Sequence, residues 1–193
     1  MPMTIEARKD ALRARFLAGR AQLTTEEWAA DNAARSRRLL DDLATHPVGT
    51  VALYASRPDE PDTRVIGESL LALGWRVLLP VLDRTPRWAS VRSWDDLRAG
   101  RMGIPEPAGE PLPPGALAGA ATIVVPCLAV GRDGSRLGTG GGWYDRALVH
   151  RAADARIIAL ARDAEIVDAL PTLSHDVAVD GYVTERVSVR LRS

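Results

Sequence analysis

Four stretches of the chain are almost uniformly apolar and rich in β-branched residues, which is typical of strands buried on both faces of a sheet. Glycine, proline or charged residues bound the stretches, and segments with a helical spacing of apolar residues lie between them. The pattern therefore predicts strands over residues 49–54, 75–80, 121–130 and 155–161.

Three segments that precede the second of these strands have the apolar spacing of helices. The first covers residues 5–22, and the second follows the capping box Thr24-Thr-Glu-Glu27 and extends to about Leu43. We expect Asp62 to cap the third helix and Gly74 to end it. The apolar face of this third helix is expected to hold Val65, Ile66, Ser69, Leu70 and Leu73.

The remaining segments have weaker patterns. Residues 87–93 alternate in polarity, which predicts a strand at a sheet edge, and residues 94–97 predict a short turn or helix. Glycine and proline make residues 102–114 an expected irregular loop. For the last third of the chain we expect a helix over 147–153, a helical turn over 165–170 and a strand region that begins at Val177.

Apolar strands that alternate with helices indicate a three-layer α/β/α fold, with a mostly parallel central sheet and helices on both faces. A chain of this length, residues 1–193, is expected to form a single domain. Ligands of such folds bind beyond the carboxyl ends of the strands. Because Glu60 follows the first strand and a glycine-rich segment follows the third, both are expected to line one crevice.

Charge and cysteine content exclude some classes of function. Lysine plus arginine total 25, and aspartate plus glutamate also total 25, so no net basic field would hold nucleic acid or an anionic membrane. No apolar run has the length of a membrane span, and no signal peptide is evident. The single cysteine, Cys127, lies in an apolar run and is expected to be a buried thiol, which suits a cytoplasmic protein.

The segment Arg136–Arg146, RLGTGGGWYDR, carries the main candidate chemistry. A strand, a glycine turn and a helix start together form a phosphate cradle, since glycine admits an anion close to the backbone N–H groups. Arg136 and Arg146 add positive charge, and Asp145 is a hard oxygen ligand suited to magnesium. The spacing matches neither a P-loop nor a dinucleotide fingerprint, and a plain flexible turn is the alternative.

The first expected helix carries a second basic feature. Lys9, the only lysine of the chain, and Arg13 are four residues apart and share a helix face, and Arg20 follows two turns later. Such a face either contacts phosphate or is a solvated basic surface, and the spacing alone leaves both open.

Val125-Pro-Cys-Leu-Ala129 followed by Gly134-x-Arg136-Leu-Gly-x-Gly-Gly-Gly-Trp-Tyr-Asp-Arg146 resembles the signature of the 5-formyltetrahydrofolate cyclo-ligase family. The resemblance covers nearly the full length. It implies conversion of 5-formyltetrahydrofolate and MgATP to 5,10-methenyltetrahydrofolate, ADP and phosphate by a monomer. Four further segments agree in order: Lys9-x-x-Leu-Arg13, Asp59-Glu-x-x-Thr63, Gly103-Ile-Pro-Glu-Pro107 and His175-Asp-x-x-Val-Asp180.

The resemblance also implies roles for individual residues. It assigns Arg136 and Asp145 to catalysis, and Asp145 and Asp180 to Mg²⁺. The N-terminal helix, about residues 4–22, is implied to contribute to the nucleotide site. The implied ATP contacts are Lys9, Arg13, Arg136, Leu137, Gly138, Thr139, Gly140, Gly141, Gly142, Trp143, Tyr144 and Asp145, and the implied folate contacts are Ala55, Glu60, Thr139, Gly140, Gly141, Gly142 and Trp143.

The chain departs from the family's pattern near the implied pocket. Gly141 stands where some relatives have a lysine, and Val130 and Gly131 stand where an aromatic residue and an aspartate are common. Arg162 replaces an aromatic residue, and Glu165 replaces a glutamine. Two alternatives therefore stay open: a non-catalytic folate- or nucleotide-binding homologue, and a different α/β enzyme that acts on sugar phosphates.

Overall fold

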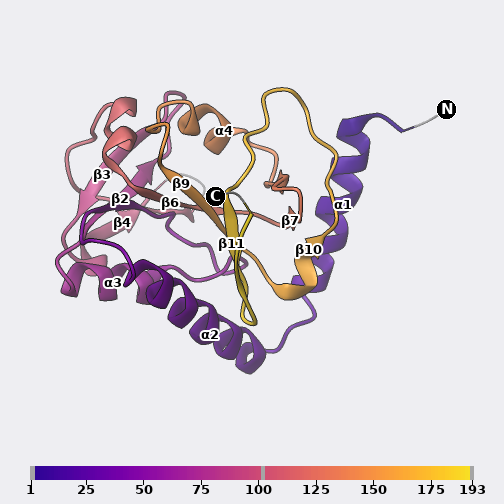
Figure 1. Cartoon of the computed structure of the whole chain (residues 1–193), viewed down its shortest axis with the longest axis horizontal. Coiled ribbons are helices and arrows are strands. Elements are labelled where there is room, and N and C mark those ends of the chain that lie inside the picture. The colour runs from indigo at the N-terminus through magenta and orange to yellow at the C-terminus, as the bar shows by residue number, and fades with distance from the viewer. Residues whose placement is uncertain (1–2, 101–102, 192–193) are drawn as a thin grey trace.

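A mostly parallel sheet forms the centre of the computed structural model, which describes residues 3–100 and 103–191 (Figure 1). Within these ranges, seven strands pair in the order β12-β11-β9-β6-β1-β2-β3. The inner strands run parallel, whereas β3 and β12 pair antiparallel at the two edges. The strands are β1 (Thr50–Ala52), β2 (Arg76–Val81), β3 (Arg87–Val91), β6 (Thr122–Pro126), β9 (Arg156–Leu160), β11 (Gly181–Val183) and β12 (Ser188–Arg190).

Helices cover both faces of this sheet, which confirms the predicted three-layer arrangement (Figure 1). The helices α2 (Thr25–Leu43) and α3 (Arg64–Ala72) pack on one face. The short helix α4 (Trp143–Leu148) and the 3-10 helix Pro114–Gly119 pack on the other. Successive strand residues point to opposite faces, so an uninterrupted apolar strand supplies both cores.

Helix α1 (Ile5–Arg20) lies apart from these layers, beside a smaller sheet (Figure 1). That sheet pairs β10 (Ile166–Val167), β7 (Ala129–Gly131) and β8 (Arg136–Leu137) in this order. Phe16 of α1 is buried against residues around β7 and β8, and this contact fixes the helix to the body of the protein; the shared cluster holds Phe16, Leu128, Ala129, Leu137 and Leu170.

Local sequence signals explain where the first helices begin and end. The capping box of Thr24 is formed, because its hydroxyl accepts the Glu27 N–H and the Glu27 carboxylate accepts the Thr24 N–H. Gly74 has a φ of +82°, a left-handed conformation that ends α3 as predicted. In the part of the chain that the structure describes, no helix is long and apolar enough to cross a membrane.

The expected strand over residues 121–130 is wrong in one respect, because it is two strands in two sheets. β6 ends at Pro126, and the chain then turns through Cys127 and Leu128 into β7. The Leu128 N–H donates to the Leu137 carbonyl oxygen, which begins the pairing of β7 with β8. Both strands are buried, so the break is invisible in the apolar pattern.

The last third of the chain differs more from expectation. α4 begins at Trp143 rather than at 147, so the glycine loop leads directly into its first turn. Residues 165–170 were expected to be helical, but a 3-10 turn at Asp163–Glu165 leads into strand β10. The strand expected from Val177 begins at Gly181.

Two smaller expectations are also corrected. The N-cap of α3 is Thr63 rather than Asp62, and Val65 and Leu73 are exposed, so the buried face of the helix is narrower than predicted. The expected irregular loop contains strand β5 (Pro105–Pro107), which pairs with β4 (Leu97–Ala99) after the 3-10 helix Trp94–Asp96; residue 102 of that loop lies outside the described residues.

Candidate functional site

The glycine loop lies between β8 and α4, and its backbone is open. Thr139, Gly140 and Gly141 are exposed, and Gly140 and Gly142 adopt φ values of +104° and +61°. A Cβ atom on Gly140 would lie 3.4 Å from Cζ of Arg13. The missing side chain therefore lets a guanidinium group approach the loop backbone.

Both basic residues of α1 face the protein, so the alternative of a solvated basic face is wrong for them. Arg13 donates from Nε to the Gly138 carbonyl oxygen at 3.0 Å and pairs with Asp10 at 2.6 Å. Lys9 is only 5% exposed, and its Nζ pairs with the Asp176 carboxylate at 2.5 Å. The helix thus presents one cation directly to the loop and holds another close to the segment before β11.

Arg136 and Asp145 form an ion pair on the inner side of the loop. Nη2 of Arg136 lies 2.8 Å from Oδ1 of Asp145, and its Nη1 donates to the Pro126 carbonyl oxygen at 3.3 Å. Oδ1 of Asp145 also accepts the Val177 N–H at 3.2 Å. Nε of Arg136 is buried without a protein partner, whereas the side chain of the neighbouring Leu137 packs in the core.

An aromatic group, defined here as Trp88, Trp143 and Tyr144, lies next to this ion pair. The ring centroids of Trp143 are 5.4 Å from Trp88 and 5.0 Å from Tyr144, with edge-to-face geometry. Nε1 of both tryptophans and the Tyr144 hydroxyl are buried without a protein hydrogen-bond partner. Buried donors without partners are rare, so these atoms are candidates for contact with a ligand or ordered water.

Glu60 adds a buried carboxylate to the aromatic group. Burial raises the pKa of Glu60, although the Arg57 N–H and guanidinium act in the opposite direction. The pKa of Tyr144 is also raised, first by burial and then by the nearby Glu60 carboxylate. Ala55, the other implied folate contact, is buried in the core at the end of β1 and offers little side-chain surface.

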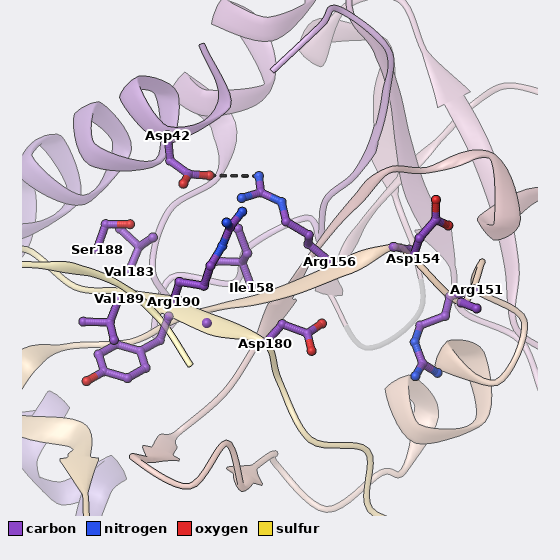
Figure 2. A pocket seen from close by; sticks show the side chains of 14 residues that line it. Asp42, Arg151, Asp154, Arg156, Ile158, Asp180, Val183, Ser188, Val189 and Arg190 are labelled. Carbon is purple, nitrogen blue, oxygen red and sulfur yellow. Dashed lines mark hydrogen bonds and ion pairs between the residues drawn. The ribbon is translucent and has the colours of Figure 1, made fainter. Parts of the chain in front are cut away.

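Asp180 does not join this site. It precedes β11, and its Oδ2 accepts the Ile157 N–H near the start of β9 at 2.8 Å. Figure 2 shows Asp180 in a cavity of about 400 Å³ with Arg156 and Asp42, at the amino ends of β9 and β11. The glycine loop follows strands at their carboxyl ends, so the expected joint magnesium shell of Asp145 and Asp180 is not formed.

The metal-binding capacity of the site is modest. Among residues 3–100 and 103–191, no group of three or more histidine, cysteine, aspartate or glutamate residues could hold a metal ion. Magnesium bound with a nucleotide needs less, because one or two carboxylates and the phosphates suffice. Oδ2 of Asp145 makes no protein hydrogen bond in the described structure, so Asp145 fits this requirement.

Cys127 is buried as expected. It is 3% exposed, and its Sγ donates to the Leu160 carbonyl oxygen. Burial and the nearby Glu165 raise the pKa of the Cys127 thiol to about 12, so the thiolate required for nucleophilic attack is scarce at neutral pH.

Three departures from the family pattern have partners within the chain. A Cβ on Gly131 would lie 2.2 Å from atoms of Asp133 and Ser135, so glycine is required in this turn. Arg162 lies 3.4 Å from the Asp31 carboxylate. Glu165 is buried in an ion pair with Arg20. None of these residues lies unpaired in the site.

Sequence reasoning missed three contributors. Trp88 completes the aromatic group but lies in an edge strand, where a tryptophan gives no specific signal. Asp176 was quoted only as part of a family segment, although it holds Lys9. The partner of Arg20, Glu165, is 145 positions away in sequence, so only the fold brings the two together.

The fold and the site together define an α/β enzyme of the kind that binds a phosphorylated ligand on a glycine loop at the carboxyl ends of its strands. Comparison with known families is more specific. The pattern of the 5-formyltetrahydrofolate cyclo-ligase family matches residues 5–185, and the chain belongs to this family of ATP-dependent ligases.

Individual relatives agree with that assignment. The 5-formyltetrahydrofolate cyclo-ligase of Mycolicibacterium smegmatis is 40% identical over 144 residues, which cover 71% of this chain and 74% of the relative. That of Escherichia coli K12 is 31% identical over 140 residues, or 70% of this chain and 77% of the relative.

Two solved structures are similar in fold. The 5,10-methenyltetrahydrofolate synthetase of Aquifex aeolicus has a TM-score of 0.78 and 30% identity, and the match covers 96% of this chain and 93% of that one. The synthetase of Mycoplasma pneumoniae has a TM-score of 0.73 at 23% identity, over 92% of this chain and 98% of its own.

Proposed function

We propose that the protein converts 5-formyltetrahydrofolate and MgATP to 5,10-methenyltetrahydrofolate, ADP and phosphate. The observation that carries the proposal is the meeting of two unlike surfaces. A glycine loop with Arg13 and Arg136 against it adjoins an aromatic group whose buried N–H and O–H donors have no protein partner.

The chemistry of the substrate explains the need for ATP. The N5-formyl group is an amide, so its carbon is a poor electrophile and its oxygen a poor leaving group. Transfer of the γ-phosphoryl group to the formyl oxygen gives an iminium-like phosphate. N10 then attacks the formyl carbon, loses its proton, and phosphate departs as the ring closes. The protein must align the two substrates and neutralise charge.

The glycine loop and its cations suit the phosphoryl group. Arg13 already contacts the loop through Gly138, and Arg136 is held by Pro126 and Asp145. Fixed guanidinium groups stabilise the charge that spreads over phosphoryl oxygens in the transition state. With Gly141 in the loop, neutralisation depends on these arginines and on Lys9.

The aromatic group suits a reduced pterin. A flat, polar ring system can pack against tryptophan edges and accept from buried N–H donors, and the orphan atoms of Trp88, Trp143 and Tyr144 supply such donors. Glu60, close to Tyr144, can accept from ring N–H groups. In this arrangement the folate and the phosphates occupy adjoining parts of one crevice.

Magnesium is assigned to Asp145 rather than to Asp180. Oδ2 of Asp145 is available for a cation bound with ATP, whereas Asp180 lies at the amino ends of the strands. When bound, Mg²⁺ would offset phosphate charge. We also propose that the protein is a single-domain, cytoplasmic monomer, because its charge is balanced and its one cysteine is buried and unpaired.

A spectrophotometric assay tests the function. Purified protein mixed with 5-formyltetrahydrofolate and MgATP is expected to develop the near-ultraviolet absorbance of the methenyl product, with one ADP released per product. Samples without ATP, or with a chelator of divalent cations, serve as controls. A folded protein that binds both substrates by calorimetry but releases no ADP would instead support the non-catalytic homologue.

A further inference from the structure

The last residue of α1 joins the loops that follow three neighbouring strands. The Arg20 guanidinium donates to the Asp59 carbonyl oxygen after β1 at 2.8 Å and to the Cys127 carbonyl oxygen after β6 at 2.7 Å. It also contacts Glu165 after β9 through two bonds, Nε to Oε1 at 2.6 Å and Nη2 to Oε2 at 2.9 Å. Since β1, β6 and β9 are adjacent, one side chain fixes three loops at the carboxyl edge.

The contact set requires the shape of a guanidinium group. Arg20 and Glu165 are 7% and 2% exposed, so neither is solvated. Burial alone would lower the pKa of Arg20, but the Glu165 carboxylate outweighs it and the pKa is raised. A lysine keeps the charge but has no planar fork, and it cannot make the two-point contact while reaching both carbonyl oxygens.

One of these loops carries a proposed folate contact. The turn of Arg57 to Glu60 is closed by its own bonds: the Arg57 N–H donates to Oε2 of Glu60, and the Glu60 N–H donates to the Arg57 carbonyl oxygen, each at 3.0 Å. The turn therefore moves as a unit. The bond from Arg20 to Asp59, the residue next to Glu60, attaches that unit to α1 and to the ends of β6 and β9.

We propose that Arg20, anchored by Glu165, is a positioning residue that sets where Glu60 lies in the folate pocket; this inference rests on the proposed function. Arg20 touches neither substrate. Its role is distinct from that of Arg13, which lies two helical turns earlier on α1 and contacts the glycine loop. Loss of the Arg20 contacts is therefore expected to affect folate binding far more than ATP binding.

The test is a comparison of kinetic constants for Arg20→Lys and the wild type. We expect the KM for 5-formyltetrahydrofolate to rise about tenfold and the KM for ATP to change less than about threefold. Titration calorimetry with 5-formyltetrahydrofolate alone is expected to show the same tenfold loss of affinity. A purely structural role would lower the melting temperature and leave both KM values unchanged.

Arg156→Lys is the matched control. Arg156 also bridges distant segments, because its Nη2 contacts Asp42 at 2.9 Å and Thr122 at 3.3 Å, but it lies at the amino ends of the strands. We expect it to lower stability without a change in either KM. If Arg20→Lys fails to fold, Glu165→Gln decides, since it keeps one acceptor oxygen and is expected to raise the folate KM about threefold.

The outcomes separate the two proposals. If the wild type makes no methenyl product, the proposed function fails, whatever the variants do. If the wild type is active and folded Arg20→Lys keeps its folate KM, or if Glu165→Gln does so when Arg20→Lys cannot be purified, the positioning role is overturned. An equal rise in the KM for ATP would also overturn it.

Discussion

Two neighbouring glycines of the loop differ in what a methyl group would meet. Gly140 has a φ of +104°, and an added Cβ would touch the Arg13 guanidinium at 3.4 Å. Nothing lies within 4 Å of the corresponding position on Gly141. The loop therefore offers a matched pair of substitutions, one strained and one permitted.

We predict that Gly140→Ala lowers the free energy of unfolding by about 1–3 kcal/mol because of its backbone strain. It should also weaken ATP binding about tenfold, since Arg13 must move. Gly141→Ala should change stability by less than about 0.5 kcal/mol. Urea unfolding and calorimetric titration with MgATP measure both effects, and equal behaviour of the two variants would contradict the assignment of Arg13 to the loop.

Asp145 offers a second test at this scale. Asp145→Asn keeps the shape and can still accept the Val177 N–H, but it removes the charge that faces Arg136 and the magnesium. Turnover is expected to fall on the order of a hundredfold, with about 1 kcal/mol lost in stability. Asp154→Asn, an exposed carboxylate at the opposite end of the sheet, is the control. Near wild-type turnover by Asp145→Asn would remove it from the metal site.

At the scale of elements, α1 depends on polar contacts as much as on packing. Phe16 supplies its main apolar contact, and ion pairs from Lys9 and Arg20 fix its two ends. Burial favours the neutral form of Asp176, but hydrogen bonds from Lys9 and from the Leu173 N–H outweigh it and lower the pKa of Asp176. The docking of the helix is therefore sensitive to acid.

The sign of this dependence follows from the lowered pKa. Asp176 stabilises the fold fully above the pKa of an unfolded aspartate, about 3.9, and the contribution is lost as pH falls through the lower folded value. We predict that Lys9→Ala costs about 1 kcal/mol of unfolding free energy at pH 6 and distinctly less at pH 3. Urea unfolding at both values measures this, and a cost independent of pH would show that the ion pair is not the cause.

The elements that sequence predicted well are those with long periodic patterns. Helices α1 and α2 and the inner strands fall close to their expected bounds, because caps and apolar runs specify them locally. β7, β8 and β10 were missed because each has only two or three residues and is stabilised by its partners rather than by its own sequence. α4 was displaced because Trp143 and Tyr144 were interpreted as loop residues.

The site divides in the same way. The glycine loop and the inward face of Lys9 and Arg13 could be proposed from local sequence and family resemblance. The packing of Trp88 on Trp143, and the distance of Asp180 from Asp145, depend on which ends of the strands meet. Only the three-dimensional arrangement determines these contacts.

At the scale of the whole molecule, the two ends of the sheet have different chemistry. The carboxyl ends hold the glycine loop, the aromatic group and Glu60, whereas the amino ends hold a cavity with Asp42, Arg156 and Asp180 (Figure 2). The proposed ligands therefore bridge α1 and the central layers at one end only, and their binding should stabilise the fold as a unit.

We predict that MgATP at about 100 times its dissociation constant stabilises the protein by about 2.7 kcal/mol, which raises the melting temperature by about 5–10 °C. Differential scanning calorimetry measures the shift. A variant with both Lys9→Ala and Arg13→Ala should show little shift at the same concentration while its response to 5-formyltetrahydrofolate is kept. An unchanged response of this variant to MgATP would place the nucleotide elsewhere.

The borders of the central sheet also have a consequence for behaviour in concentrated solution. On one border, β3 is bridged on its outer side, because Trp88 and Leu112 exchange backbone hydrogen bonds. On the other, β12 spans only Ser188–Arg190 and ends in a charged residue. Unpaired strand backbones invite other chains to add on, and short or occupied borders give them little to recruit. The molecule should therefore resist fibre growth even when crowded.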